Sequence, residues 1–144
     1  MKVTRIKKLM IAGISEVTNN ETEMSEESGK IAALWENYFE KDIYKKTFDK
    51  SNSDFMYGVY SDYGSDASGN YKVTDGVEVT KAKNAIVIED KKYLVFTKKG
   101  ELPMVVVELW EEIWEHFEKN SEYERAFEID FEQYAKEDEI EMYV

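Results

Sequence analysis

The segments LWENYF (residues 34–39) and LWEEIW (residues 109–114) share Leu, Trp and Glu in the same order. The constant offset between them also aligns the apolar residues on either side. Apolar side chains at i, i+3, i+4 and i+7 are typical of an amphipathic helix. The sequence therefore predicts two long helices, over residues 24–42 and 103–119, that repeat one another.

Strand-like segments surround both predicted helices. They are rich in β-branched and aromatic residues and are bounded by Gly, Ser and Asp, and they cover residues 3–17, 54–60, 71–80, 85–88, 93–96, 126–134 and 138–144. The order is β-α-β-β, given twice. We expect an α+β fold in which two pseudo-repeated β-α-β-β units, about 1–80 and 85–144, form one domain over residues 1–144. The antiparallel-rich sheet would carry two helices on one face and a ligand cleft between the repeats.

Two segments interrupt this pattern. The polar, acidic stretch NNETEMSEESGK at residues 19–30 predicts a loop that leads into the first helix. Gly76 lies inside the strand YKVTDGVEVT, where an isolated glycine indicates a bulge or a bend.

The composition excludes several classes of function. The chain has 31 acids and 19 bases, a net charge of -12, which argues against direct binding of nucleic acid. It has no Cys and a single histidine, His116, so neither a thiolate site nor a zinc motif is expected, and no cofactor is predicted. No apolar run approaches the roughly 20 residues of a membrane span, and the first residues lack a signal-peptide pattern. We expect a cytoplasmic protein without a membrane partner.

The last segment, FEIDFEQYAKEDEIEMYV (residues 127–144), places an acid at every second position of a predicted strand. That alternation usually marks a solvated face. Glu132, however, lies two residues before Tyr134 and therefore points to the same side. From the strand pattern alone, Glu132 is either a solvated acid or a carboxylate beside aromatic residues in a pocket.

Other aromatic residues are candidates for the same pocket. Members of the pairs Tyr57 and Tyr60, and Tyr93 and Phe96, are an odd number of residues apart, so one member of each pair should face the cleft. Trp110 is a further candidate from the second helix. Trp35, its equivalent in the first helix, is interpreted as a core residue.

The sequence resembles the GyrI-like small-molecule-binding domain, the effector-binding domain of AraC-type and MerR-type multidrug regulators, and also single-domain integron-associated effector-binding proteins. The resemblance rests on IAALWENYF, YGVYSDY, GNYKVTDGVEV, YLVF, VVELWEEIWEHF and the terminal DFEQY and IEMYV, which occur in the family's order. It implies a pocket between the repeats in which a late-strand glutamate, here Glu132, contacts cationic, lipophilic ligands. It also implies that Tyr134 is the aromatic residue beside it.

The resemblance and the residues together favour a stand-alone protein that binds amphipathic, cationic aromatic small molecules in an aromatic cleft anchored by a glutamate. The expected site residues are Glu132, Tyr134, Trp110, Tyr60, Tyr93 and Phe96. Two alternatives stay open. One is a small-molecule hydrolase that uses Glu132 as a general base, although binding without catalysis is favoured. The other is a protein that modulates DNA gyrase; the sequence identifies no protein partner.

Overall fold

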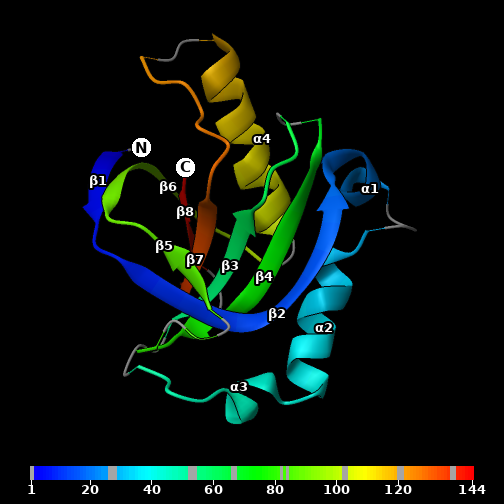
Figure 1. The fold of residues 1–144 in the computed structure, drawn as a ribbon. Coiled ribbons are helices and arrows are strands. Elements are labelled where there is room, and N and C mark those ends of the chain that lie inside the picture. Colours follow the sequence, from blue (N-terminus) through cyan, green and yellow to red (C-terminus); the bar gives the residue numbers. More distant parts are fainter. Residues whose placement is uncertain are drawn as a thin grey trace.

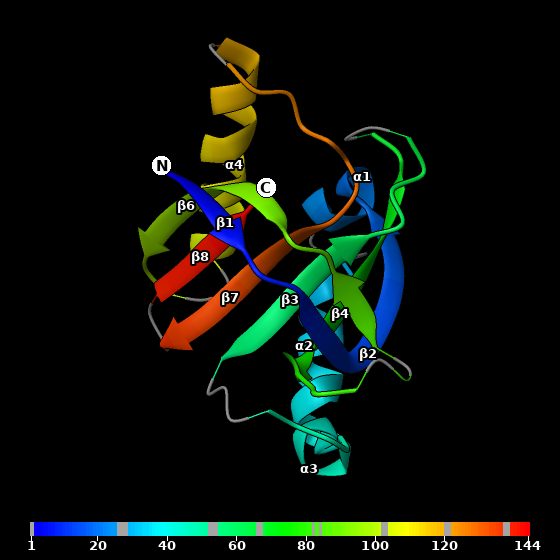
Figure 2. The same cartoon turned by 60° about the vertical axis from the view of Figure 1, so that its left-hand side comes forward.

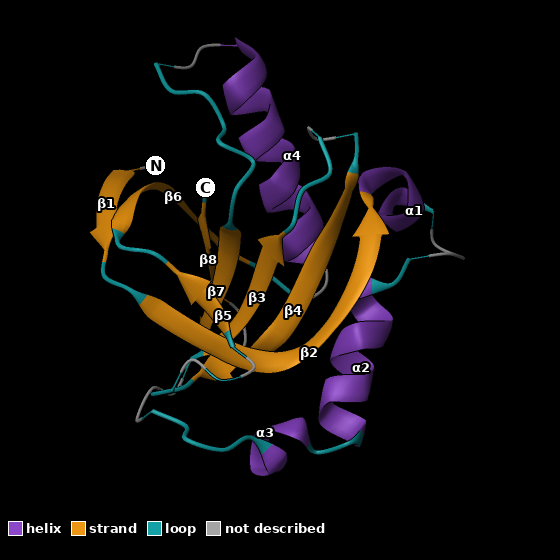
Figure 3. Cartoon of the chain, viewed as in Figure 1, coloured by secondary structure: helices purple, strands orange, loops and turns teal. Residues whose placement is uncertain are grey.

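The computed structural model describes residues 2–25, 29–51, 55–65, 68–81, 83, 85–101, 104–119, 122–136 and 139–144. Within these ranges the strands are β1 (Lys2–Ile6), β2 (Leu9–Asn19), β3 (Met56–Ser61), β4 (Asn70–Glu78), β5 (Ile86–Ile88), β6 (Lys91–Lys99), β7 (Asp130–Lys136) and β8 (Glu139–Tyr143). The helices are α1 (Asn20–Met24), α2 (Ile31–Glu40), α3 (Ile43–Lys46) and α4 (Met104–Lys119). Figures 1 and 3 show the curled sheet with its helices, which confirms the α+β class.

The strands form one antiparallel sheet in the order β1-β6-β8-β7-β3-β4-β2-β5. If β1 is exchanged with β5, β2 with β6, β3 with β7 and β4 with β8, the result is the same strand order read from the other edge of the sheet. The sheet therefore has the pseudo-twofold topology expected of two related units, with β3 and β7 paired at its centre. The outermost strands are exchanged, because β1 pairs with β6 and β5 pairs with β2. Figure 2 shows β7 and β3 side by side in the middle of the sheet.

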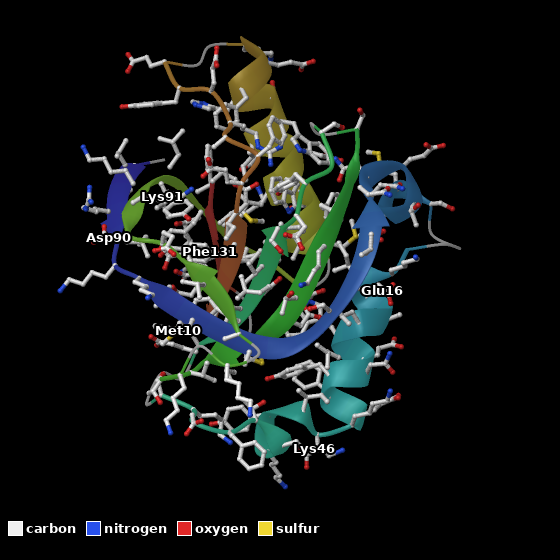
Figure 4. All side chains as sticks on the ribbon, viewed as in Figure 1. Met10, Glu16, Lys46, Asp90, Lys91 and Phe131 are labelled. Carbon is white, nitrogen blue, oxygen red and sulfur yellow. The ribbon has the colours of Figure 1, made fainter. Side chains whose placement is uncertain are left out.

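The amphipathic stripes place both long helices on the same side of the sheet. Leu34 of α2 and Leu109 and Ile113 of α4 are buried in one apolar cluster, together with side chains of β3, β4, β6, β7 and β8. Because successive strand residues point to opposite faces, the remaining strand residues form a second cluster on the other side. Phe131, labelled in Figure 4, belongs to that second cluster.

The first helix is shorter than predicted at both ends, and it ends at Glu40 rather than at residue 42. The first begins at Ile31 rather than residue 24, and part of the predicted loop 19–30 forms the short helix α1. The side chain of Asn19 accepts a hydrogen bond from the backbone N–H of Thr22, which caps α1. Residue 103, the predicted start of the second helix, lies outside the described residues. Among the helices in the described ranges, none is long and apolar enough to cross a membrane.

The bulge that the sequence predicted at Gly76 does not form, because Gly76 pairs in regular register with Gly13 on β2 and Tyr57 on β3. A Cβ added at Gly76 would lie 2.2 Å from the carbonyl oxygen of Ala12, and one added at Gly13 would lie 1.7 Å from that of Asp75. The two glycines therefore allow a close approach of β2 and β4 that no side chain would permit.

Candidate functional site

Glu132 lies on β7 at the centre of the sheet and points toward the helices. Only 1% of its surface is exposed. Tyr60 on β3 donates its hydroxyl hydrogen to Oε1 of Glu132, and Tyr134 donates to Oε2. The solvated-strand interpretation of Glu132 is therefore wrong, and the structure brings together the predicted residues Glu132, Tyr134 and Tyr60.

Burial sets the electrostatics of this carboxyl group. Removal from water raises the pKa of Glu132 to about 7, and the hydrogen bonds from Tyr134 and Tyr60 oppose that rise. The pKa values of both tyrosines are raised well above 10, first by burial and then by the nearby Glu132. Both hydroxyls consequently stay protonated at neutral pH and remain donors to the carboxylate.

A tryptophan from each long helix packs against one of these tyrosines. The ring of Trp110 meets Tyr60 edge-on at 5.2 Å between centroids, and its indole N–H donates to the Tyr60 hydroxyl at 3.4 Å. The ring of Trp35 meets Tyr134 edge-on at 5.5 Å. The site therefore includes Trp110, as predicted. It also includes Trp35, which the sequence indicated only as core.

A single row of cross-strand neighbours runs through the site. It consists of Phe96, Met142, Glu132, Gly58 and Asp75, each paired with the next across β6, β8, β7, β3 and β4. Directly paired residues project to the same face, so Phe96, a predicted site residue, lies on the Glu132 side. Its ring contacts His116 of α4 edge-on at 5.5 Å.

Tyr93, the other candidate of that pair, lies on the opposite face. Its ring packs against Phe131 and Tyr143 in the second cluster, away from Glu132. The separation of three positions between Tyr93 and Phe96 requires this, because alternation along a strand sends residues an odd number of positions apart to opposite faces. The structure does not bring Tyr93 to the site.

Asp75 is a site residue that the sequence did not single out. It is fully buried, and neither carboxylate oxygen has a hydrogen-bond partner among the described residues. Burial, followed by repulsion from Glu132, raises the pKa of Asp75 to about 9. The surrounding strand pattern, YKVTDGVEVT, gave no signal, because an acid before a glycine usually indicates a turn.

A buried ion pair borders the site. Arg125 donates to Asp130 at 2.6 Å, and Tyr63 donates to the same carboxylate oxygen at 2.5 Å. The guanidinium lies 4.3 Å from the ring centroid of Phe127 and 5.4 Å from that of Trp110. An internal cation thus already occupies an aromatic cage next to Trp110.

The predicted cleft is filled by its own aromatic side chains in this structure, since Glu132 is enclosed. A cavity of about 240 Å³ opens nearby, at the end of α2, and is lined by Tyr38, Phe39, Asp42, Tyr44, Phe55, Met56 and Val77. Met56 pairs with Tyr134 in the register of β3 and β7, so the cavity begins one row from Glu132. Within the described ranges, no group of three His, Asp or Glu side chains is arranged to hold a metal ion.

The chain is similar to known proteins over nearly its whole length. Residues 2–144 match the family described as Cass2, integron-associated effector binding protein. A candidate transcriptional regulator protein of Bacillus subtilis (strain 168), YobU, is 28% identical over 139 residues, which cover 92% of this chain and 84% of that protein.

Two solved structures share the fold. The integron cassette protein VCH_CASS2, from the mobile metagenome of Vibrio cholerae, has a TM-score of 0.86 and 27% identity, and the alignment covers 99% of this chain and 92% of that chain. The structure of SAV2435 bound to tetraphenylphosphonium has a TM-score of 0.77 and 18% identity, and it covers 99% of this chain and 90% of that chain. At 18% identity the second likeness concerns the fold alone. Because the family match extends over residues 2–144, the chain belongs to the integron-associated effector-binding proteins and has a GyrI-like effector-binding domain.

Proposed function

We propose that this effector-binding protein binds lipophilic organic cations, with Glu132 as the anionic contact between aromatic walls. One observation carries the proposal: a carboxylate that is 1% exposed is held by two tyrosine hydroxyls at the centre of the sheet. A buried carboxylate without a cation is unfavourable, because it has lost its hydration. A ligand that brings a positive charge into the site would offset that loss.

The aromatic residues favour a diffuse cation over a compact, strongly hydrated one. Trp35 and Trp110 flank the two tyrosines, and each aromatic face would add roughly 0.5–2 kcal/mol of cation–π attraction. A phosphonium or quaternary ammonium centre has no N–H donor. Such a cation would pair with Glu132 while Tyr60 and Tyr134 keep their hydrogen bonds to it. SAV2435, which shares the fold, has been solved with tetraphenylphosphonium, and this supports the same ligand class here.

Ligand entry requires the aromatic side chains to move, because Glu132 is enclosed. Trp35 and Trp110 are only half-buried, and the cavity beside Met56 and Val77 offers space into which neighbouring side chains can turn. We expect binding to separate the tryptophans from the tyrosines, and therefore to change tryptophan fluorescence.

Hydrolysis by the same site is the second candidate function. A general base works best with a pKa near the operating pH, and the pKa of Glu132 is about 7. The protonated tyrosines beside it could donate to a developing oxyanion. Both carboxylate oxygens already accept hydrogen bonds from Tyr60 and Tyr134, an arrangement that serves an anionic contact better than a base, so the binding function is favoured.

The test compares three probes of similar shape: tetraphenylphosphonium, the tetraphenylborate anion and neutral triphenylphosphine oxide. We expect the cation to bind tightly, the neutral probe weakly and the anion not at all, as measured by calorimetry and tryptophan fluorescence. Glu132→Gln should weaken cation binding more than tenfold and leave the neutral probe unchanged. The control Glu16→Gln, at an exposed side chain of β2 that is labelled in Figure 4, should change neither.

Equal affinity of wild type and Glu132→Gln for the cation would overturn the proposal. Mass spectrometry after incubation with a panel of aryl esters separates the two functions. Intact esters exclude hydrolysis of that panel, whereas hydrolysis that is lost in Glu132→Gln would favour the enzyme.

A further inference from the structure

Asp75 and Glu132 are placed symmetrically about Gly58. Gly58 on β3 pairs with Glu132 on β7 and with Asp75 on β4, so both acids project to the helix side of the sheet. The residue between them on β3 has no side chain of its own, and the indole of Trp35 lies over it. A Cβ there would lie 3.3 Å from Oε1 of Glu132 and 3.6 Å from Cζ2 of Trp35.

The buried acids of this face differ in how they are satisfied. Glu132 accepts hydrogen bonds from two tyrosines, and Asp130 accepts them from Arg125 and Tyr63. Asp75 is 0% exposed, and both of its carboxyl oxygens lack a partner in the described part of the chain. Burying an unpaired carboxyl group is unfavourable by several kcal/mol even when the group is protonated. The burial of Asp75 therefore does not stabilise the fold, and its position needs another explanation.

The groups around Asp75 are also unsatisfied or acidic. Tyr38 of α2 has a buried hydroxyl without a partner, and its pKa is raised to about 12 by burial and then by Asp75. Glu132 and Asp75 repel one another when both are ionised, and Asp75 also raises the pKa of Tyr134. Asp75 is thus electrostatically coupled both to a second buried carboxyl group, Glu132, and to the unpaired hydroxyl of Tyr38.

The cavity at the end of α2 lies close to Asp75 along β4. Val77, which lines the cavity, lies two residues from Asp75 on the same face of β4, and Tyr38 lines it as well. Phe39, Tyr44 and Phe55 supply aromatic walls. Asp75 and Glu132 do not line the cavity, so a ligand that enters here reaches the two acids once the lining side chains move aside.

We propose that Asp75 is a second anionic contact of the ligand site, so that the site prefers ligands with two cationic centres over single cations of the same shape. The proposal rests on the proposed function of Glu132 and names its ligand class more closely. The two acids are two strand spacings apart, about 10 Å between Cα atoms. Two acids at this spacing suit a short, rigid dication with an aromatic ring between its charges.

The test uses matched quaternary ammonium probes of nearly the same shape: the dication p-xylylenebis(trimethylammonium) and the monocation 4-methylbenzyltrimethylammonium. Both displace a bound fluorescent cation in competition titrations. Wild type should bind the dication at least tenfold more tightly. Asp75→Asn should abolish that preference while keeping its affinity for the monocation and for tetraphenylphosphonium. Asp62→Asn is the control, since Asp62 is 75% exposed at its side chain and stands at a positive φ that Asn tolerates.

A second measurement does not depend on the variant folding. In wild type, calorimetry in buffers of different ionisation enthalpy should show that the dication releases about one more proton than the monocation, because it ionises both carboxyl groups. Equal proton release, or a preference for the dication that persists in Asp75→Asn, would overturn the inference. If tetraphenylphosphonium binding depends on Glu132 but the dication has no advantage, only this inference fails. If no cation binds wild type, the proposed function fails with it.

Discussion

Trp35 and Trp110 occupy matching positions on α2 and α4, and each packs edge-on against a tyrosine from the other half of the chain. Trp35 meets Tyr134 at an interplanar angle of 81°, and Trp110 meets Tyr60 at 82°. Both tyrosines donate to Glu132. Each half therefore supplies one helix and one tyrosine to the site.

The crossed pairing predicts similar roles for the two tryptophans. Trp35→Ala and Trp110→Ala should each weaken binding of tetraphenylphosphonium by about 2- to 30-fold, the range of a single cation–π contact of roughly 0.5–2 kcal/mol. Isothermal titration calorimetry measures this without relying on the removed fluorophore. Phe48→Leu, at a side chain that is 87% exposed, should have no effect. Loss of affinity in only one tryptophan variant would show that the ligand uses one half of the site.

Cation affinity should depend on pH through Glu132. Its pKa is about 7, and a cation binds the ionised form, so affinity should be constant above about pH 7 and fall tenfold per unit below it. Glu132→Gln should remove this dependence. Titrations with tetraphenylphosphonium between pH 5 and 9 measure it, and a pH-independent wild type would contradict the prediction.

Tyr134→Phe should move that pH profile upward. The hydrogen bond from Tyr134 stabilises the ionised carboxylate, and its removal raises the pKa of Glu132 further. The midpoint of the affinity profile should therefore shift to higher pH, whereas Tyr123→Phe, at an exposed side chain outside the cavity, should leave the midpoint where it is. An unchanged midpoint in Tyr134→Phe would mean that its hydroxyl does not act on Glu132.

Asp75 should make the free protein less stable at alkaline pH. Its folded pKa is about 9, above the ordinary 3.8, so the folded state holds a proton that the unfolded state has lost. The stabilisation that comes from this proton is fully present below about pH 4 and is lost as the pH rises toward 9. Glu132 contributes in the same direction, but its part is already lost above about pH 7. Between pH 7 and 9 the free energy of unfolding should fall by about 1.4 kcal/mol per pH unit.

Chemical denaturation at pH 7, 8 and 9 tests this slope. Asp75→Asn should remove it and should be more stable than wild type at pH 9, because a neutral amide replaces a carboxyl group that is being forced to ionise. Glu132→Gln should keep the slope in this window. A wild-type slope of zero would show that Asp75 is not held protonated in the folded state.

The sequence predicted those parts of the site that follow from periodicity. The shared LWE segments predicted the two helices, and the spacing of Glu132 and Tyr134 placed them on one side of β7. The same alternation indicated that only one of Tyr93 and Phe96 faces the site. It could not show which of the two faces the site, because the face that each side chain takes depends on how β6 pairs with β1 and β8.

Contacts between distant segments could not be predicted. Asp75 is recognisable only once β3 places Gly58 between it and Glu132. Trp35 resembles a core residue on a helical stripe, and only the crossed helix arrangement brings it to Tyr134. Arg125 follows an acidic segment and gave no signal, yet it is buried against Asp130, with only 8% of its side chain exposed. Nothing described here bears on the gyrase alternative, which stays a prediction.

Arg125 and Asp130 should stabilise the fold mainly because each neutralises the buried charge of the other. Burial raises the pKa of Asp130, and Arg125 is the strongest opposing influence. Arg125→Met would leave that carboxylate buried without its cation, so the free energy of unfolding should fall by about 3–5 kcal/mol. Adding Asp130→Asn should restore most of the loss, since the unpaired charge is then gone. Urea denaturation of the two single variants and the double variant gives the coupling energy, and additive losses would show that the two residues do not act as a pair.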